Sequence, residues 1–126
     1  MRDNHEGMPE ILDAFEKDGH YFSIVRLEHN GQERRFRFGV SHHGYLALKR
    51  VFELRPFSTM PGLVCRYFFV PSYCRLDESH MMMTVRVEQG RDGKQMEIEA
   101  PRDLVANLKW FIELDDWQKA EHLHVA

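Results

Sequence analysis

The stretch from Gly62 to Val70, GLVCRYFFV, constrains the fold more than any other part of this chain. It is the densest apolar run, and turn residues stand at both of its ends. Alternate side chains of a strand point to opposite faces of a sheet. One face would carry Leu63, Cys65, Tyr67 and Phe69, and the other Val64, Arg66, Phe68 and Val70. Both sets are apolar apart from one arginine, so the pattern predicts a central strand over 62–70 that is covered on both sides.

Arg66 is the only charged residue in this run. A buried guanidinium is costly unless it is paired and hydrogen-bonded. We therefore expect Arg66 either to extend to solvent at the sheet edge or to meet a carboxylate. The alternative is that it contributes to a functional site on its face of the sheet.

The segment 20–40 has the strongest hairpin pattern, because Asn30-Gly31 tolerates the positive φ values of a type I′ turn. With these two residues as the loop, Arg26 faces Arg35 and Val25 faces Phe36. This register defines a core face with Ser23, Val25, Leu27, Phe36, Phe38 and Val40. It also defines an opposite face, the hairpin face, with Phe22, Ile24, Arg26, Glu28, Glu33, Arg35 and Arg37.

A second hairpin is predicted with its turn at Asp92-Gly93 and strands over 81–89 and 94–100. In this register Val87 faces Ile98 and Val85 faces Ala100. The core face would then hold Met83, Val85, Val87, Ile98 and Ala100.

Four segments have helical spacing. In the first, Pro9 suits an opening position, Ile11 and Phe15 lie four apart, and Gly19 suits a C-terminal cap. Ser41 and Pro101 are suitable starts for two later helices. We predict helices over about 9–18, 42–54 and 102–114, and a short C-terminal helix that begins at Asp115 or Asp116.

These elements predict an α+β fold with a single antiparallel sheet of about five strands packed with helices. The chain has 126 residues, of which 43% are hydrophobic, enough for one domain over 1–126 with a real core. It has no apolar run of the roughly 20 residues that a membrane span needs, and its first residues lack the apolar stretch of a signal peptide, so we expect neither. Cys65 and Cys74 are expected to be free thiols, so we expect a cytoplasmic protein that does not contact membranes.

The hairpin face is the most informative predicted surface. Residues 26–55 hold seven basic and three acidic residues, and like charges directly opposite each other, such as Arg26 and Arg35, are destabilising. The purely structural interpretation is an exposed network of ion pairs between these arginines and Glu28 and Glu33. The functional interpretation is a small non-enzymatic binding protein of the adaptor, inhibitor or immunity type that recognises another protein and can also form a homodimer. Its binding residues would be Arg26, Arg35, Arg37, Phe22 and Ile24.

An alternative is a small enzyme or ligand-binding domain with a pocket near the 55–80 loop region. Its weak catalytic candidates would be Cys74 as nucleophile or thiol ligand, His80 or His42 as base, and Asp77 or Glu78 as orienting acid. Their spacing does not match a zinc site, and we expect no metal and no cofactor. Nucleic-acid binding through 26–55 is the weakest alternative. The net charge is -3, and register sends Phe36 and Phe38 to the core, away from any stacking platform.

Overall fold

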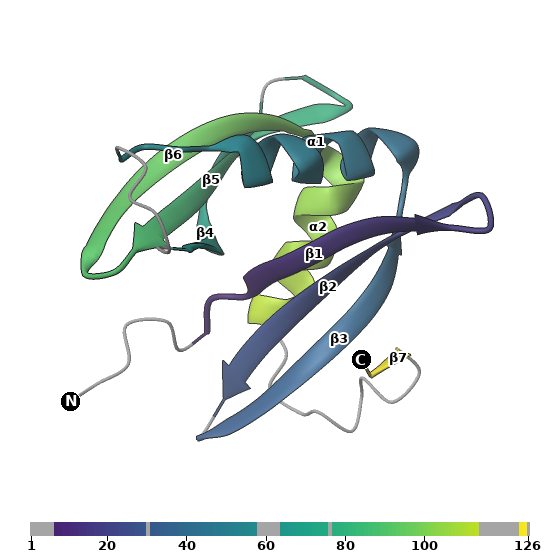
Figure 1. Ribbon diagram of the computed structural model, residues 1–126. Coiled ribbons are helices and arrows are strands. Elements are labelled where there is room, and N and C mark those ends of the chain that lie inside the picture. Colours follow the sequence, from purple (N-terminus) through teal and green to yellow (C-terminus); the bar gives the residue numbers. More distant parts are fainter. Residues whose placement is uncertain (1–6, 30, 58–63, 76, 114–123, 126) are drawn as a thin grey trace.

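A computed structural model describes residues 7–29, 31–57, 64–75, 77–113 and 124–125. Its sheet curves around one helix, and a second helix lies across the same side (Figure 1). The elements in chain order are β1 (Glu10–Lys17), β2 (His20–His29), β3 (Gln32–Val40), α1 (His42–Glu53), β4 (Cys65–Arg75), β5 (His80–Gln89), β6 (Asp92–Pro101), α2 (Arg102–Ile112) and β7 (His124–Val125).

The sheet consists of two three-stranded meanders, each followed by a helix. The strand order is β6-β5-β4-β1-β2-β3-β7, so the two meanders meet through their first strands, β1 and β4. In the described part of the chain β1 and β4 share a single pair in register, Glu10 with Phe68. Phe69 N–H also donates to the Pro9 carbonyl at 2.9 Å. We call this narrow junction the seam.

The predicted α+β class with one antiparallel sheet is confirmed, but the sheet has six long strands and the two-residue β7 instead of about five. The helices predicted over 42–54 and 102–114 are present as α1 and α2. Ser41 caps α1 as predicted, because its hydroxyl accepts from Gly44 N–H at 3.0 Å. The predicted C-terminal helix lies outside the described residues except at its end, where His124 belongs to β7.

The prediction of a helix over 9–18 is wrong, because this segment forms β1. A β-bulge lies between Ile11 and Asp13, and it shifts the alternation of side chains by one residue. Ile11 and Ala14 therefore both face the core although they are three apart. The bulge thus gives a strand the spacing that is typical of a helix.

The prediction of a helix C-terminus at Gly19 is also wrong, for a related reason. Asp18 and Gly19, expected at the end of a helix, form the two-residue turn of the β1–β2 hairpin, with φ values of 53° and 79°. Positive φ at both positions is the signature of a type I′ turn, and Asp-Gly is a preferred pair for it. Glycine adopts the same positive φ at the C-terminus of a helix. A glycine alone therefore does not distinguish a hairpin turn from the end of a helix.

The register predicted for the β2–β3 hairpin is confirmed, including the pairs Arg26 with Arg35 and Val25 with Phe36. The register predicted for β5–β6 is wrong. The turn is Gly90-Arg91, and Val85 faces Met96 instead of Ala100. Gly90 has a φ of 61° at the first turn position, as a type II′ turn requires. The observed register differs from the predicted one by an even number of residues. The side chains predicted for the core face therefore remain on the same side of the sheet.

Strand β4 extends beyond the predicted end at Val70 to Arg75. Pro71 is accommodated at a register shift between Val70 and Tyr73, the kind of position where proline is tolerated in a sheet. The predicted start at 62–63 lies outside the described residues. As predicted, the centre of this strand is covered on both sides: Phe68 and Phe69 point to opposite faces and both are fully buried.

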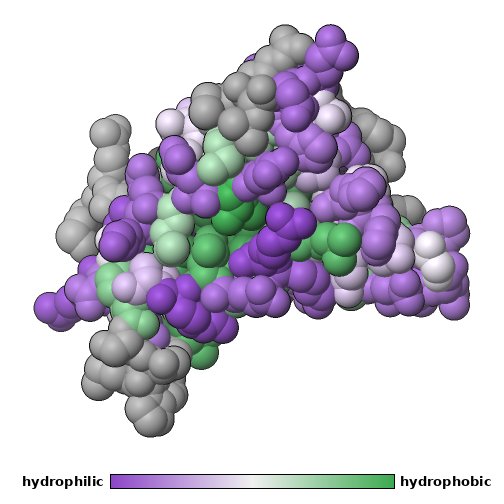
Figure 2. All heavy atoms as spheres, turned by 90° about the horizontal axis from the view of Figure 1, so that it is seen from above, coloured by the Kyte–Doolittle hydropathy of each residue, from purple (hydrophilic) through white to green (hydrophobic). Residues whose placement is uncertain are grey.

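The main core lies between the sheet and the two helices. Helix α1 contacts both meanders, β6 on one side and β1–β3 on the other. Seen from above the view of Figure 1, apolar side chains gather in a hollow at the centre of the molecule and polar side chains border them (Figure 2). No helix in the described ranges is long and apolar enough to cross a membrane.

Candidate functional site

The hairpin face is built around Phe22. Its ring stacks on Phe15 of β1, directly opposite in the ladder, with centroids 5.5 Å apart. On the other side the Arg37 guanidinium carbon lies 5.4 Å from the Phe22 centroid. Phe22 and Ile24 are both half-buried. The hairpin face therefore presents two aromatic rings, from β1 and β2, beside the Arg37 guanidinium of β3. This arrangement favours cation–π attraction.

Arg26 does not remain an uncompensated charge opposite Arg35. Its Nη1 donates to Glu10 Oε1 at 3.0 Å, and its Nε lies 2.9 Å from Glu33 Oε1. Burial alone would lower the pKa of Arg26, but the hydrogen bond and the charges of Glu33 and Glu10 raise it overall. The hydrogen bond from Arg26 is in turn the largest cause that lowers the pKa of Glu33. The sequence pattern could not supply Glu10, because that residue was expected on a helix.

Arg35 and Arg37 differ from Arg26 in their surroundings. Arg35 is exposed and makes no ion pair with any residue in the described ranges. Arg37 is half-buried, and its Nε is covered from solvent without a hydrogen-bond partner there. A buried donor without an acceptor costs about 1–3 kcal/mol. The fold therefore satisfies Arg26 but leaves the covered Nε of Arg37 without an acceptor among the described residues.

Cys74, Asp77 and His80, three of the weak catalytic candidates, lie near the β4–β5 connection. Cys74 is paired with Met82 through its backbone, and its side chain lies outside the described part. Asp77 Oδ1 accepts backbone N–H groups of Ser79 and His80, each at 2.8 Å, and these bonds lower the pKa of Asp77. The Asp77 carboxylate thus holds a turn together.

The geometry of Asp77, Ser79 and His80 does not resemble a proton relay. Ser79 Oγ and Asp77 Oδ1 approach the same ring nitrogen, His80 Nδ1, at 2.9 and 3.4 Å. A relay of the serine-hydrolase type uses one imidazole nitrogen for the nucleophile and the other for the acid. His80 also borders a polar cavity of about 190 Å³ between α1 and β6, beside His43, Arg50 and Glu99.

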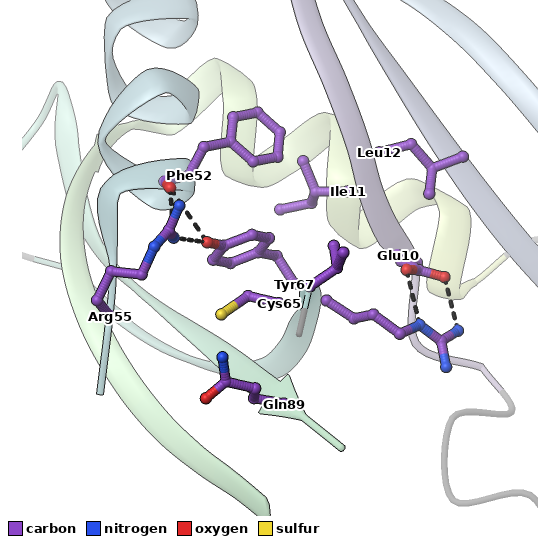
Figure 3. Close-up of a pocket in the computed structure, with 10 residues that line it drawn as sticks. Glu10, Ile11, Leu12, Phe52, Arg55, Cys65, Tyr67 and Gln89 are labelled. Carbon is purple, nitrogen blue, oxygen red and sulfur yellow. Dashed lines mark hydrogen bonds and ion pairs between the residues drawn. The ribbon is translucent and has the colours of Figure 1, made fainter. Parts of the chain in front are cut away.

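A larger pocket, of about 560 Å³, opens at the seam, where β1 and β4 diverge beyond their single pair (Figure 3). We call it the seam pocket. It is lined by residues 10–12 of β1, Phe52 and Arg55 at the end of α1, residues 64–67 at the start of β4, and Gln89 of β5. Neither Asp77 nor His80 lines it. Part of its wall does come from the 55–80 region where a pocket was predicted.

Two polar clusters hold the walls of the seam pocket. Arg66 donates to both oxygens of Glu10, from Nε to Oε2 at 3.0 Å and from Nη2 to Oε1 at 2.8 Å. Arg66 thus meets a carboxylate, as expected, and its side chain also extends to solvent, with 44% of it exposed. On the opposite wall Arg55 Nη1 donates to the Phe52 and Leu54 carbonyls at 2.7 and 2.9 Å and to the Tyr67 hydroxyl. Burial raises the pKa of Tyr67.

Sequence reasoning did not identify Glu10 or Gln89 as site residues. Glu10 is almost fully buried although it is charged, and Gln89 is also buried. The expectation that Arg66 could meet a carboxylate implied such a residue but did not identify it as Glu10. Nothing in the sequence indicated that Gln89 is a site residue, because it is simply the last residue of a predicted strand. Comparisons of the chain with family models, with curated proteins and with solved structures found no match.

Proposed function

We propose that this chain is a small non-enzymatic binding protein that recognises an acidic surface of another protein through its hairpin face. The contact residues are Arg35, Arg37, Phe22 and Ile24, and Arg26 is held in place behind them by Glu10 and Glu33. The observation that carries the proposal is Arg37. Its guanidinium lies over the half-buried Phe22 ring, and it makes no ion pair with any of the described residues.

Two features support a protein partner. Arginine and aromatic residues are the types that dominate binding energy at protein interfaces, and here they lie on a sheet surface, not in a cleft. Carboxylates of a partner would give the guanidinium groups of Arg35 and Arg37 the ion pairs that the described residues do not supply. We place this function in the cytoplasm, since Cys65 is a free thiol.

The test compares three proteins as baits for affinity capture from the native lysate: the wild type, Arg35→Glu with Arg37→Glu, and a control with Arg91→Glu and Lys94→Glu. The control makes the same charge change on two exposed residues of the β5–β6 hairpin. We expect the wild type and the control to retain one stoichiometric protein that the Arg35 and Arg37 variant loses.

The affinity of the purified pair, measured by calorimetry, should fall at least tenfold for the Arg35 and Arg37 variant and should weaken with salt, as electrostatic recognition does. Equal retention by all three baits would contradict the proposed site. Light-scattering mass of the free protein tests the prediction of a homodimer separately.

A further inference from the structure

We propose that the seam pocket binds a small neutral heterocycle with a carboxamide or lactam edge, the class that includes nicotinamide and the free nucleobases, and that Gln89 recognises this edge. The site is independent of the proposed protein interface, because its lining includes none of Arg35, Arg37, Phe22 and Ile24. Either proposal can fail without the other.

The size and walls of the pocket suit a small organic ligand. A volume of about 560 Å³ lies within the range of about 300–1,000 Å³ that is typical of such sites. Apolar walls come from Ile11 and Leu12 on one side and Phe52 on the other. The Phe52 and Tyr67 rings meet edge to face, with centroids 5.4 Å apart. Aromatic rings at a pocket wall favour a planar ligand, which can stack or pack against their edges.

The charges around the pocket favour an uncharged ligand. Arg66 is paired through two hydrogen bonds with Glu10, which Arg26 also contacts. Arg55 binds the last carbonyls of α1, where the partial negative charge of the helix end complements the guanidinium. A charged ligand would lose its hydration, and Arg55, the guanidinium at the pocket that has no carboxylate partner among the described residues, already donates to two carbonyls and the Tyr67 hydroxyl.

Gln89 supplies the polar group that would orient such a ligand. It faces Cys65 in the β4–β5 ladder, and both side chains border the pocket (Figure 3). A glutamine amide presents a donor and an acceptor side by side, the complement of a carboxamide, a lactam or the edge of adenine. The adjacent Cys65 sulfur is polarizable and packs well against aromatic rings.

The test is an NMR titration of the full chain with nicotinamide, adenine and uracil, and with nicotinate as the matched charged probe. We expect saturable shifts at Cys65, Tyr67 and Gln89 with at least one neutral probe, at about millimolar affinity. Nicotinate should bind at least tenfold more weakly than nicotinamide. Ligand binding should also slow alkylation of Cys65 by iodoacetamide, read by mass spectrometry of its peptide.

Variants separate recognition from folding. Gln89→Leu should weaken binding of the neutral probe about tenfold, the value of one to two hydrogen bonds, while Gln95→Leu, at an exposed glutamine of β6, should leave it unchanged. Leu12→Trp should block the pocket by filling it. The proposal is overturned if no neutral probe gives saturable shifts at these residues, if nicotinate binds as tightly as nicotinamide, or if Gln89→Leu, folded as judged by its spectrum, binds like the wild type.

Discussion

Arg66 of β4 and Glu10 of β1 form a two-point ion pair at the place where the two halves of the sheet meet, with N···O distances of 3.0 and 2.8 Å. The pair lies beside the one register contact between these strands, Glu10 with Phe68. Arg66 also covers the buried Phe68 ring, whose centroid lies 4.9 Å from the guanidinium carbon. The ion pair therefore joins two meanders whose backbones exchange few hydrogen bonds.

Glu10→Ala should destabilise the protein, because it leaves Arg66 and Arg26 without their shared acceptor at the seam. Removing one member of a fully buried pair costs about 3–5 kcal/mol. The Arg66 side chain is 44% exposed, so solvent compensates part of this loss, and we expect about 2 kcal/mol. Urea unfolding measures it, with Glu97→Ala on the exposed face of β6 as control. Equal midpoints for the two variants would show that the pair does not hold the seam.

Asp18→Ala distinguishes the observed β1–β2 turn from the helix expected at 9–18. In the turn Asp18 has a φ of 53°, which alanine adopts at a cost of about 1 kcal/mol or more, so the variant should be less stable. At the end of a helix the same change would be stabilising, since alanine is the best helix former and an acid is unfavourable there. Asp18→Gly, measured beside it by thermal unfolding, should be as stable as the wild type or more so.

Glu33 should titrate below its ordinary range because Arg26 hydrogen-bonds to it. A depressed folded pKa means that the stabilising effect of the ionised carboxylate is present above the unfolded value of about 4.3 and is lost as pH falls through the folded value. Carboxyl NMR signals measure this midpoint directly. Arg26→Met should move the midpoint of Glu33 upward, whereas Arg91→Met, on the distant hairpin, should not. An unchanged midpoint in Arg26→Met would contradict the ion pair.

Turn pairs and side-chain alternation predicted correctly the parts of the fold that depend on residues close together in the sequence. Asn30-Gly31 fixed the β2–β3 register, and parity then placed Phe36 and Phe38 in the core as observed. The errors arose where two structures share one local pattern. Ile11 and Ala14 have helical spacing because of a bulge. In the second hairpin, both Gly90-Arg91 and Asp92-Gly93 are suitable turn pairs, and the turn forms at Gly90-Arg91.

The candidate site was harder to predict than the fold because it depends on contacts between distant segments. Glu10 and Arg66 are 56 residues apart, and Phe52 and Arg55 reach the pocket only after α1 is placed against both meanders. Hydrophobic periodicity shows which face of an element is buried, but it does not show which elements become neighbours. The hairpin face was found in the sequence, because it lies within a single hairpin.

Tyr67→Phe tests the link between the seam pocket and the end of α1. The Tyr67 hydroxyl donates toward the Phe52 carbonyl at 3.1 Å and accepts from Arg55, so its removal should cost about 1–1.5 kcal/mol at neutral pH. Tyr45→Phe, on the side of α1 that contacts Tyr21, is the matched control and should change stability less.

The pH dependence of the same two variants gives a second, independent measurement. Burial raises the folded pKa of Tyr67, so the unfolded chain releases this proton first, near pH 10. The wild type should therefore keep its full stability below about pH 10 and lose part of it as pH rises from there toward the folded pKa. Tyr67→Phe should lose stability less steeply in this range than Tyr45→Phe, as measured by urea unfolding. Parallel curves would mean that the Tyr67 hydroxyl is not held in the wall of the pocket.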